Sequence, residues 1–158
     1  MHAPLTRRRC LQLAGSALMA GAGSAGAQAA TLPLSVSLRE ELAAALAQGQ
    51  PLVVMVSLDG CPFCKVARQN YLSPMREQQG LPVVQVDMRS AQSLIDFQGR
   101  RLSHDAQVRA WGVRLAPTVL FFGRQGREVA ERLVGGYLPD FYGAYLDERL
   151  AQARASLR

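Results

Sequence analysis

The sequence predicts an α/β domain in which a mixed central sheet has helices on both faces. Three observations lead to this class. The run LVVMVS at 52–57 is continuously apolar, as expected of a strand that is covered on both sides. From residue 37 to residue 112, helical and extended patterns alternate in the order of βαβ units. Two further strand-like runs around a short turn then add an antiparallel pair before a final helix.

Length and composition agree with one folded domain. The chain has 158 residues, 49% of them hydrophobic and 19% charged, and this balance excludes a disordered protein. The net charge of +6 is modest, and no basic run alternates with aromatic residues after residue 27, so nucleic acid is not an expected partner. No repeat or long linker divides the sequence, and we expect a monomer.

Residues 1–27 have the pattern of a cleavable export signal. Three arginines at 7–9 precede a weakly apolar Ala/Gly/Leu stretch, and an A-x-A cleavage pattern follows at 25–27 or alternatively at 27–29. TRRRCLQ matches the twin-arginine signal in part. The low hydropathy favours that route, with the general export route as the alternative. We therefore expect a single mature domain at 28–158, located in the periplasm.

Four runs rich in apolar and β-branched residues have the pattern of strands. They lie at 52–57, 82–88, 118–123 and 127–135. The last two flank Arg124-Gln125-Gly126 and are expected to form a hairpin. Residues 89–102 are polar and irregular, with Gly99 as a turn, and no regular element is predicted there.

Helices are expected where a capping residue opens an amphipathic run. Ser37 and Glu40 form a capping box for the first helix, which Gly49 ends. Ser103 caps a later helix that stops at Gly112.

The remaining two helices are marked by proline. One starts at Cys61 and is interrupted at Ser73-Pro74, where Ser73 can cap a further turn that Gly80 closes. The last helix starts at Pro139. Its apolar residues at helical spacing predict one core-facing side, formed by Phe141, Tyr142, Tyr145, Leu146 and Leu150.

The segment GCPFCK at 60–65 carries the residues with distinctive chemistry. Of three cysteines, Cys10 lies in the export signal, which leaves Cys61 and Cys64 in the processed chain. A bridge between these two closes so short a loop that it adds little stability. No second Cys pair or His pair is available for zinc, and Lys65 stands where haem attachment needs His. A redox dithiol is therefore expected, with no metal and no bound cofactor.

The position of the motif, after an apolar strand and at the start of a helix, explains its expected reactivity. Cys61 falls at the helix N-terminus, where free backbone N–H groups and the helix dipole favour a thiolate. Pro62 suits the first helical position, and Lys65 adds a nearby positive charge. Cys64, one turn further on, is expected to be more buried. Phe63 between them either contacts the substrate or fills space.

These positions predict a two-step exchange in which Cys61 attacks a substrate disulfide and Cys64 resolves the mixed disulfide. Pro117 stands directly before a strand, where proline is unusual. A cis peptide bond between Ala116 and Pro117 would make a tight turn there, facing the dithiol. Such a turn could offer the Ala116 backbone to an extended substrate chain, with Thr118 completing this substrate-binding motif.

Several segments resemble the thioredoxin superfamily over residues 35–155: CPFCK, WGVRLAPT, FFGRQGRE and Gly135-Gly136. The resemblance implies a thioredoxin-like fold, with Cys61 as nucleophile, Cys64 as resolving thiol and Pro117 as the cis-proline. More narrowly, the Ser73-Pro74 break, IDFQGRRLS and RLVGGYLPDFYGAYL are similar to exported SoxW-like thioredoxins. That similarity implies thiol–disulfide exchange around sulfur-oxidation proteins. Because the periplasm is kept oxidising, a reductase there also needs a membrane electron donor, expected to be of the DsbD or CcdA kind.

Two positions depart from cytosolic thioredoxins. Those proteins have a buried aspartate on the strand before the motif, which helps to deprotonate the resolving cysteine, and this chain has Met55 there. They also have tryptophan before the first cysteine, where this chain has Gly60. Asp59 is either a substitute proton acceptor or simply an exposed charge.

The sequence favours disulfide reduction among the enzyme functions. The interval from Cys61 to Pro117 has no room for the helical insertion of a DsbA-type oxidase, and no dimerisation region of a DsbC-like isomerase precedes Ser35. Thiol oxidation, isomerisation and sulfenic-acid reduction stay as alternatives. From another class, the domain could be a non-catalytic redox-sensitive module that captures a partner along the Ala116 edge.

Overall fold

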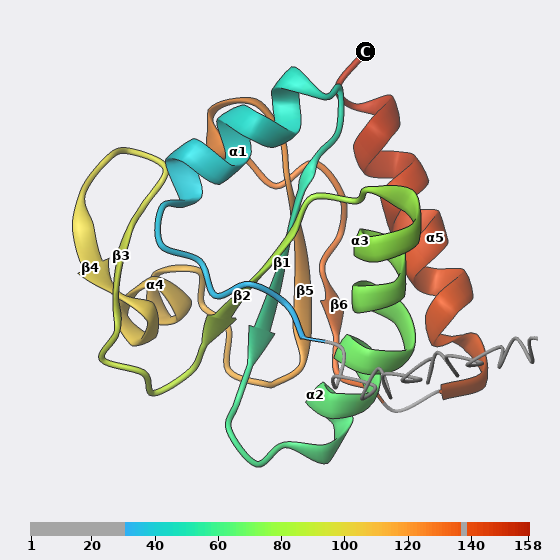
Figure 1. The fold of residues 1–158 in the computed structure, drawn as a ribbon, viewed down its shortest axis with the longest axis horizontal. Helices are drawn as coiled ribbons and strands as arrows, with labels where there is room; N and C mark the ends of the chain where they lie inside the picture. The colour runs from blue at the N-terminus through green and yellow to red at the C-terminus, as the bar shows by residue number, and fades with distance from the viewer. Residues whose placement is uncertain (1–30, 137–138) are drawn as a thin grey trace, which may run out of the picture.

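A four-stranded sheet in the order β2-β1-β5-β6 runs through the middle of the molecule (Figure 1). The computed structural model describes residues 31–136 and 139–158, and the predicted export signal lies outside them. The strands are β1 (Leu52–Ser57), β2 (Val83–Asp87), β3 (Ser93–Ile95), β4 (Arg101–Ser103), β5 (Thr118–Phe122) and β6 (Leu133–Val134). The α-helices are α1 (Leu38–Ala47), α2 (Pro62–Val66), α3 (Ser73–Gln79), α4 (His104–Ala110) and α5 (Pro139–Ala155).

Strand β1 is the central element of this sheet and is buried along its whole length. It pairs in parallel with β2, where Met55 lies opposite Gln85, and antiparallel with β5, where Val54 lies opposite Leu120. Strand β5 in turn pairs antiparallel with β6. The predicted mixed sheet is therefore confirmed.

Helices cover both faces of the sheet, as predicted (Figure 1). Side chains of β1 alternate between the faces. Val53 and Met55 belong to a core that includes residues of α2 and α5, whereas Val54 and Val56 belong to a core built with α1 and α4. We call these the dithiol face and the α1/α4 face.

Helix α1 begins where predicted, but a different acid completes its cap. The Ser37 hydroxyl accepts a hydrogen bond from the Glu40 backbone N–H at 3.3 Å. The carboxylate that reaches back is that of Glu41, which accepts from the backbone N–H groups of Val36 and Ser37 and from the Ser35 hydroxyl. The assignment of that role to Glu40 was wrong, because Glu40 is exposed and Glu41 lies over the preceding segment.

The predicted break at Ser73-Pro74 is also wrong. The chain stays helical from α2 to α3 through a π-helical stretch at Ala67–Leu72. The Ser73 N–H bonds to the carbonyl oxygen of Arg68, five residues earlier, and the wider turn accommodates Pro74 without a break. The buried Ser73 hydroxyl has no partner and caps nothing among the described residues. Gly80 ends α3 with φ +67, as predicted.

The segment 89–102 is more regular than its sequence predicts. Strands β3 and β4 form a separate hairpin, with Leu94 opposite Leu102 and Gly99 in the turn at φ +83. The buried carboxylate of Asp96 holds this turn, because it accepts from the N–H groups of Gln98 and Arg100 and from the Arg100 guanidinium. The hairpin is therefore stabilised by hydrogen bonds to Asp96, and its sequence lacks the apolar alternation from which a strand is usually predicted.

The C-terminal region differs from prediction in two details. Strand β6 is only two residues long, since the first part of the expected strand, 127–132, makes just a bridge at Glu128. Helix α5 starts at Pro139, as predicted, and buries Tyr142, Leu146, Leu150 and Ala153. Phe141 and Tyr145, expected in the core, are 59% and 41% exposed, because each lies one position before the buried stripe and so about 100° around the helix. Within residues 31–136 and 139–158, no helix combines the length and apolar character that crossing a bilayer requires.

Candidate active site

Cys61 and Cys64 are joined by a disulfide at the N-terminus of α2, with their Cα atoms 5.2 Å apart. Cys61 is the N-cap residue, and the backbone N–H of Cys64 donates to its sulfur at 3.1 Å. Pro62 occupies the first helical turn. Cys64 is 1% exposed and Cys61 is half-buried, so the predicted difference in access is confirmed. The helix end thus directs N–H groups at the sulfur that faces solvent, an environment that stabilises a thiolate in the reduced protein.

The loop between β1 and α2 presents the disulfide. β1 ends at Ser57, and the Cys61 N–H donates to the carbonyl oxygen of Leu58 at 3.2 Å, which closes a tight turn. Gly60 has φ +70 in this turn, a backbone conformation that favours glycine. A tryptophan at this position would be strained in the same backbone conformation.

The loop before β5 faces the disulfide, as predicted. The Ala116–Pro117 peptide bond is cis, and the Ala116 carbonyl oxygen lies 3.8 Å from the Cys61 sulfur. The loop is held from within, because the buried Thr118 hydroxyl donates to the carbonyl oxygen of Leu115 at 2.7 Å. The Gly135 N–H donates to the Pro117 carbonyl oxygen at 2.8 Å and ties the loop to the end of β6. Thr118 therefore positions the loop from inside.

One side of the disulfide is apolar. Phe63 is 53% exposed, and Val66 and Leu115 are exposed as well. A Cβ at Gly136 would lie 3.5 Å from the Cβ of Phe63 and 3.8 Å from Cγ of Pro117, so the backbone at Gly136 runs between the helix and the loop. These apolar groups are available to a substrate chain beside Cys61. Contact between Phe63 and a substrate stays a prediction.

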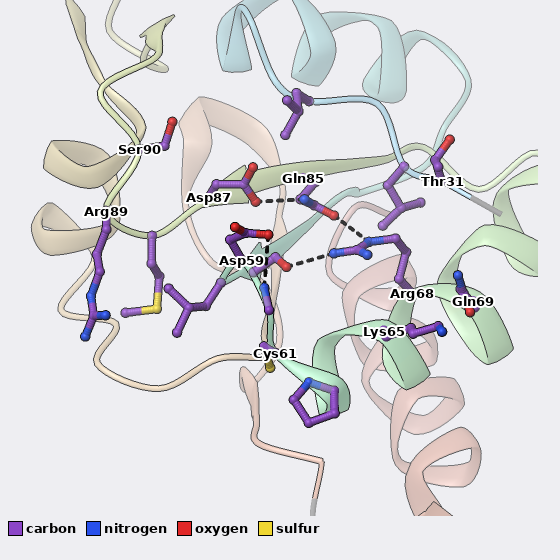
Figure 2. A pocket seen from close by; sticks show the side chains of 17 residues that line it. Thr31, Asp59, Cys61, Lys65, Arg68, Gln69, Gln85, Asp87, Arg89 and Ser90 are labelled. Atoms are coloured by element: carbon purple, nitrogen blue, oxygen red, sulfur yellow. Dashed lines mark hydrogen bonds between the residues drawn. The ribbon is translucent and has the colours of Figure 1, made fainter. Parts of the chain in front are cut away.

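The other side of the disulfide is a groove with a volume of about 1030 Å³, which is lined by charged and polar side chains together with apolar ones such as Leu58 and Met88 (Figure 2). Arg68 lies in this groove, and its guanidinium donates to the side-chain oxygens of Gln85 at 2.7 Å and Ser57 at 2.9 Å. The Gln85 amide nitrogen donates in turn to the Asp87 carboxylate at 2.7 Å. The groove that includes Cys61 is therefore also lined by a chain of hydrogen-bonded side chains on β1, β2 and the facing helix.

This network was not predicted, although two features of the sequence indicate it. Arg68 follows Cys64 by four residues, which places it on the same side of the helix. Gln85 interrupts an otherwise apolar strand. A polar residue in a buried strand needs a hydrogen-bonding partner, and the facing helix supplies it.

The other predicted site residues lie at the groove as well. Lys65 and Asp59 line it, and both side chains are exposed (Figure 2). The Asp59 carboxylate accepts from the Gly60 N–H at 3.0 Å. Met55 is fully buried in the same core as Cys64, so no carboxylate takes the place of the thioredoxin aspartate on β1. Proton acceptance by Asp59 stays a prediction.

The described residues contain no group of three or more metal-ligating side chains that could hold an ion. The redox group of this site is the disulfide itself.

The sequence pattern of the thioredoxin-like domain matches residues 38–150. The chain belongs to the thioredoxin-like family. A thioredoxin-like domain with an active-site disulfide is a thiol–disulfide oxidoreductase. The Cys61–Cys64 disulfide and the cis peptide bond before Pro117 agree with this assignment. A comparison with curated proteins finds no match.

Solved structures of similar fold include three from different settings. Oxidised mitochondrial thioredoxin 3 of Saccharomyces cerevisiae is 16% identical, with a TM-score of 0.49, covering 76% of this chain and 93% of its own. The oxidised C-terminal domain of DsbD from Neisseria meningitidis is 18% identical, with a TM-score of 0.48 and coverage of 70% and 90%. The periplasmic thioredoxin SoxS from Paracoccus pantotrophus is 20% identical, with a TM-score of 0.43 and coverage of 66% and 99%. All three are distant similarities.

Proposed function

We propose that this thioredoxin-like protein reduces disulfides of exported proteins in the periplasm. The observation that carries the proposal is the place of the Cys61 sulfur. It is accessible, it accepts an N–H at the start of α2, and it lies 3.8 Å from the Ala116 carbonyl oxygen of the cis-proline loop. An extended substrate chain beside that loop would bring its own disulfide to Cys61.

The reaction follows from the two cysteines. In the reduced protein, the Cys61 thiolate attacks one sulfur of the substrate disulfide, so a Cys61–substrate bond forms and the second substrate sulfur leaves as a thiolate that takes a proton from water. Cys64 then loses its proton and attacks Cys61, which releases the first substrate sulfur. The substrate gains two electrons and the protein returns to the disulfide form. A membrane dithiol donor of the DsbD or CcdA kind would reduce it again.

The cellular setting rests on sequence features. The twin-arginine-like segment with arginines at 7–9 supports export, and the similarity to SoxW-like thioredoxins supports a client among sulfur-oxidation proteins. The direction of electron flow is supported by the short path from α3 to Pro117, which holds β2, the β3–β4 hairpin and α4 and no larger helical insertion.

Insulin reduction tests the activity. We expect the purified domain to reduce insulin disulfides with dithiothreitol as the electron source, and Cys61→Ser to abolish turnover, because the attacking sulfur is gone. A turnover rate unaffected by Cys61→Ser would refute the proposed enzyme. In Cys64→Ala the mixed disulfide cannot be resolved, so this variant should capture the client protein from a periplasmic extract.

The reduction potential of the Cys61–Cys64 couple tests the direction. A value near about −270 mV would support a reductant, and one near about −120 mV would contradict it. Thiol oxidation or isomerisation is the second candidate. It is favoured by one observation: the carboxylate on β1 is absent, and the guanidinium of Arg68 lies beside Gln85, the strand neighbour of Met55. A cation in the surroundings of a thiolate stabilises the reduced form, so the positive charge of Arg68 would shift the couple toward the oxidising side.

A further inference from the structure

We propose that the groove beside Cys61 receives an anionic group of the substrate and that Arg68 is the residue that recognises it. The inference rests on the proposed function, since it concerns the substrate of the same disulfide exchange. It adds a charge preference that the family resemblance does not supply.

The position of Arg68 is fixed by two hydrogen bonds. Nε donates to the Gln85 amide oxygen and Nη2 to the Ser57 hydroxyl, and these acceptors belong to neighbouring strands. Gln85 lies directly opposite Met55 in the sheet, and Ser57 follows Met55 by two residues. The guanidinium therefore lies over the ends of β1 and β2 and forms part of the wall that continues to Cys61 (Figure 2).

The charge of Arg68 is not neutralised by an adjacent carboxylate. Among the described residues Arg68 makes no ion pair, and the amide of Gln85 stands between it and Asp87. A guanidinium has five N–H donors, and two of those of Arg68 are used. A half-buried cation with unused donors in a planar fork suits a carboxylate or a similar anion.

The rest of the lining leaves the groove with an excess of positive charge. Lys65, the only lysine of the chain, and Arg89 line it together with Arg68, against the carboxylates of Asp59 and Asp87. Both carboxylates already accept hydrogen bonds, Asp59 from the backbone and Asp87 from Gln85. Hydrogen bonds from neutral groups do not cancel the charges of these carboxylates, so the three cations leave the lining with one excess positive charge. Among the cations, Arg68 has a guanidinium that is fixed in place by two hydrogen bonds, whereas Lys65 and Arg89 are exposed side chains.

The shared chemistry of the expected substrates is a disulfide with a carboxylate close to the sulfur that Cys61 attacks. The carboxylate can come from an acidic residue beside the client's cysteine or from a small anionic thiol. Before the attack, a carboxylate bound at Arg68 directs the neighbouring substrate sulfur toward Cys61, and it stays at Arg68 while the Cys61–substrate bond exists. No electrons pass through Arg68, and the exchange is the two-step reaction described above.

Small disulfides of different charge test the inference. Rate constants for the reduced, full processed protein are measured with anionic 3,3′-dithiodipropionate, neutral bis(2-hydroxyethyl) disulfide and cationic cystamine. The same Cys61 thiolate attacks all three, so a change in its ionisation largely cancels in the ratio of rates. We expect the anionic disulfide to react faster than the cationic one, and Arg68→Gln to lower that ratio about fivefold or more.

Two variants sharpen the assignment. Arg76→Gln removes the same charge from an exposed position two turns along the helix and should leave the ratio unchanged. Arg68→Lys keeps the charge but loses the planar fork, so the ratio should recover in part. An equal change of the ratio in Arg76→Gln and Arg68→Gln would overturn the inference, and so would a wild-type ratio near one that is accompanied by no preference for Glu in the peptides described next.

A peptide pair separates the two sources of the anion. Mixed disulfides of a cysteine peptide with Glu or Gln beside the cysteine are compared with the small disulfides. If the anionic member reacts faster in both series, the carboxylate alone is the recognised group. If the Glu peptide reacts faster than the Gln peptide but the small disulfides show no such difference, the recognised group is an acidic segment of a protein. If none of these disulfides is reduced, the proposed function fails; if all are reduced at rates independent of charge, only this inference fails.

Discussion

His104 and Asp96, on the side of the sheet that carries the α1/α4 face, have hydrogen-bonded side chains, whereas several buried polar atoms on the helices of the dithiol face have no partner within the described ranges. His104 is fully buried and bonds through both ring nitrogens, accepting from the Asp87 N–H at 3.0 Å and donating to the Ser35 carbonyl oxygen at 2.9 Å. Asp96 accepts three hydrogen bonds. By contrast, the buried Ser73 and Tyr142 hydroxyls and Arg149 Nε, all on α3 or α5, have no partner among the described residues.

The difference indicates that the two faces have different tasks. The α1/α4 face fixes the N-terminal segment and the β3–β4 hairpin to the sheet through satisfied polar groups, each of which is costly to disturb. The dithiol face contains the π-helical stretch, the exposed Phe63 and the half-buried Arg68, and it tolerates unmet polar atoms. Removal of a hydrogen-bonded polar group on the α1/α4 face and removal of an unpartnered one on the dithiol face should therefore change stability in opposite directions.

The largest effect is expected for His104→Phe. The ring volume is kept, but the Asp87 N–H and the Ser35 carbonyl oxygen lose their partner in a fully buried site. The free energy of unfolding should fall by about 3 kcal/mol, measured by urea denaturation of the oxidised protein. His104→Gln retains a donor and an acceptor and should lose less; equal losses in the two variants would show that packing, and not hydrogen bonding, stabilises this site.

Asp96→Asn should lower the free energy of unfolding by about 2 kcal/mol at pH 7, since hydrogen bonds to a charged acceptor are replaced. Burial by itself raises the pKa of Asp96, but the hydrogen bonds and charge of Arg100, with the Gln98 N–H, outweigh it and hold the pKa below its ordinary value. A depressed pKa contributes stability above the unfolded value of about 3.9 and loses it as the pH falls through the folded value.

The difference between wild type and Asp96→Asn should therefore be constant above about pH 5 and shrink below about pH 4. Urea denaturation at several pH values measures it. A difference that does not change with pH would mean that the carboxylate charge is not the stabilising feature.

The smallest effect, and one of opposite sign, is expected for Tyr142→Phe. The buried Tyr142 hydroxyl has no partner within the part of the chain that the structure describes, and burial, with a smaller effect of Tyr71, raises its pKa, so the group stays neutral. Its removal should raise the free energy of unfolding by up to about 1 kcal/mol. Tyr145→Phe, at an exposed position of the same helix, is the matched control and should change nothing. A clear loss of stability in Tyr142→Phe would contradict the contrast between the faces.

Local signals predicted most of the fold. The Ser37 and Ser103 caps each act within three residues, so the sequence alone identifies where α1 and α4 begin. The apolar run of β1 and the motif that follows it predicted the buried strand and the disulfide-bearing helix. At the site, the two cysteines and Pro117 have distinctive chemistry, which made them recognisable without knowledge of the packing.

The errors share a different cause, which is dependence on distant partners. The β3–β4 hairpin has short polar strands, and its bonds reach segments far away in sequence, such as Ile95 N–H to the Val36 carbonyl oxygen. The role of Arg68 could not be predicted, because it depends on the contacts that its helix makes with β1 and β2. Phe141 and Tyr145 match a helical stripe, but the neighbouring stripe is the one that the sheet covers.

The N-terminal segment has a practical consequence for experiments. The Ser35 N–H donates to the carbonyl oxygen of Gln85, and the Gln85 N–H donates to the carbonyl oxygen of Pro33. These bonds hold the N-terminal segment along β2, so that Thr31 and Leu32 line the groove (Figure 2). A purification tag joined directly before Thr31 would begin in the wall of the groove that also includes Cys61, where its own charges would bias kinetic measurements of charge preference. A tag joined after Arg158, at the end of the molecule away from α2, leaves that approach open (Figure 1).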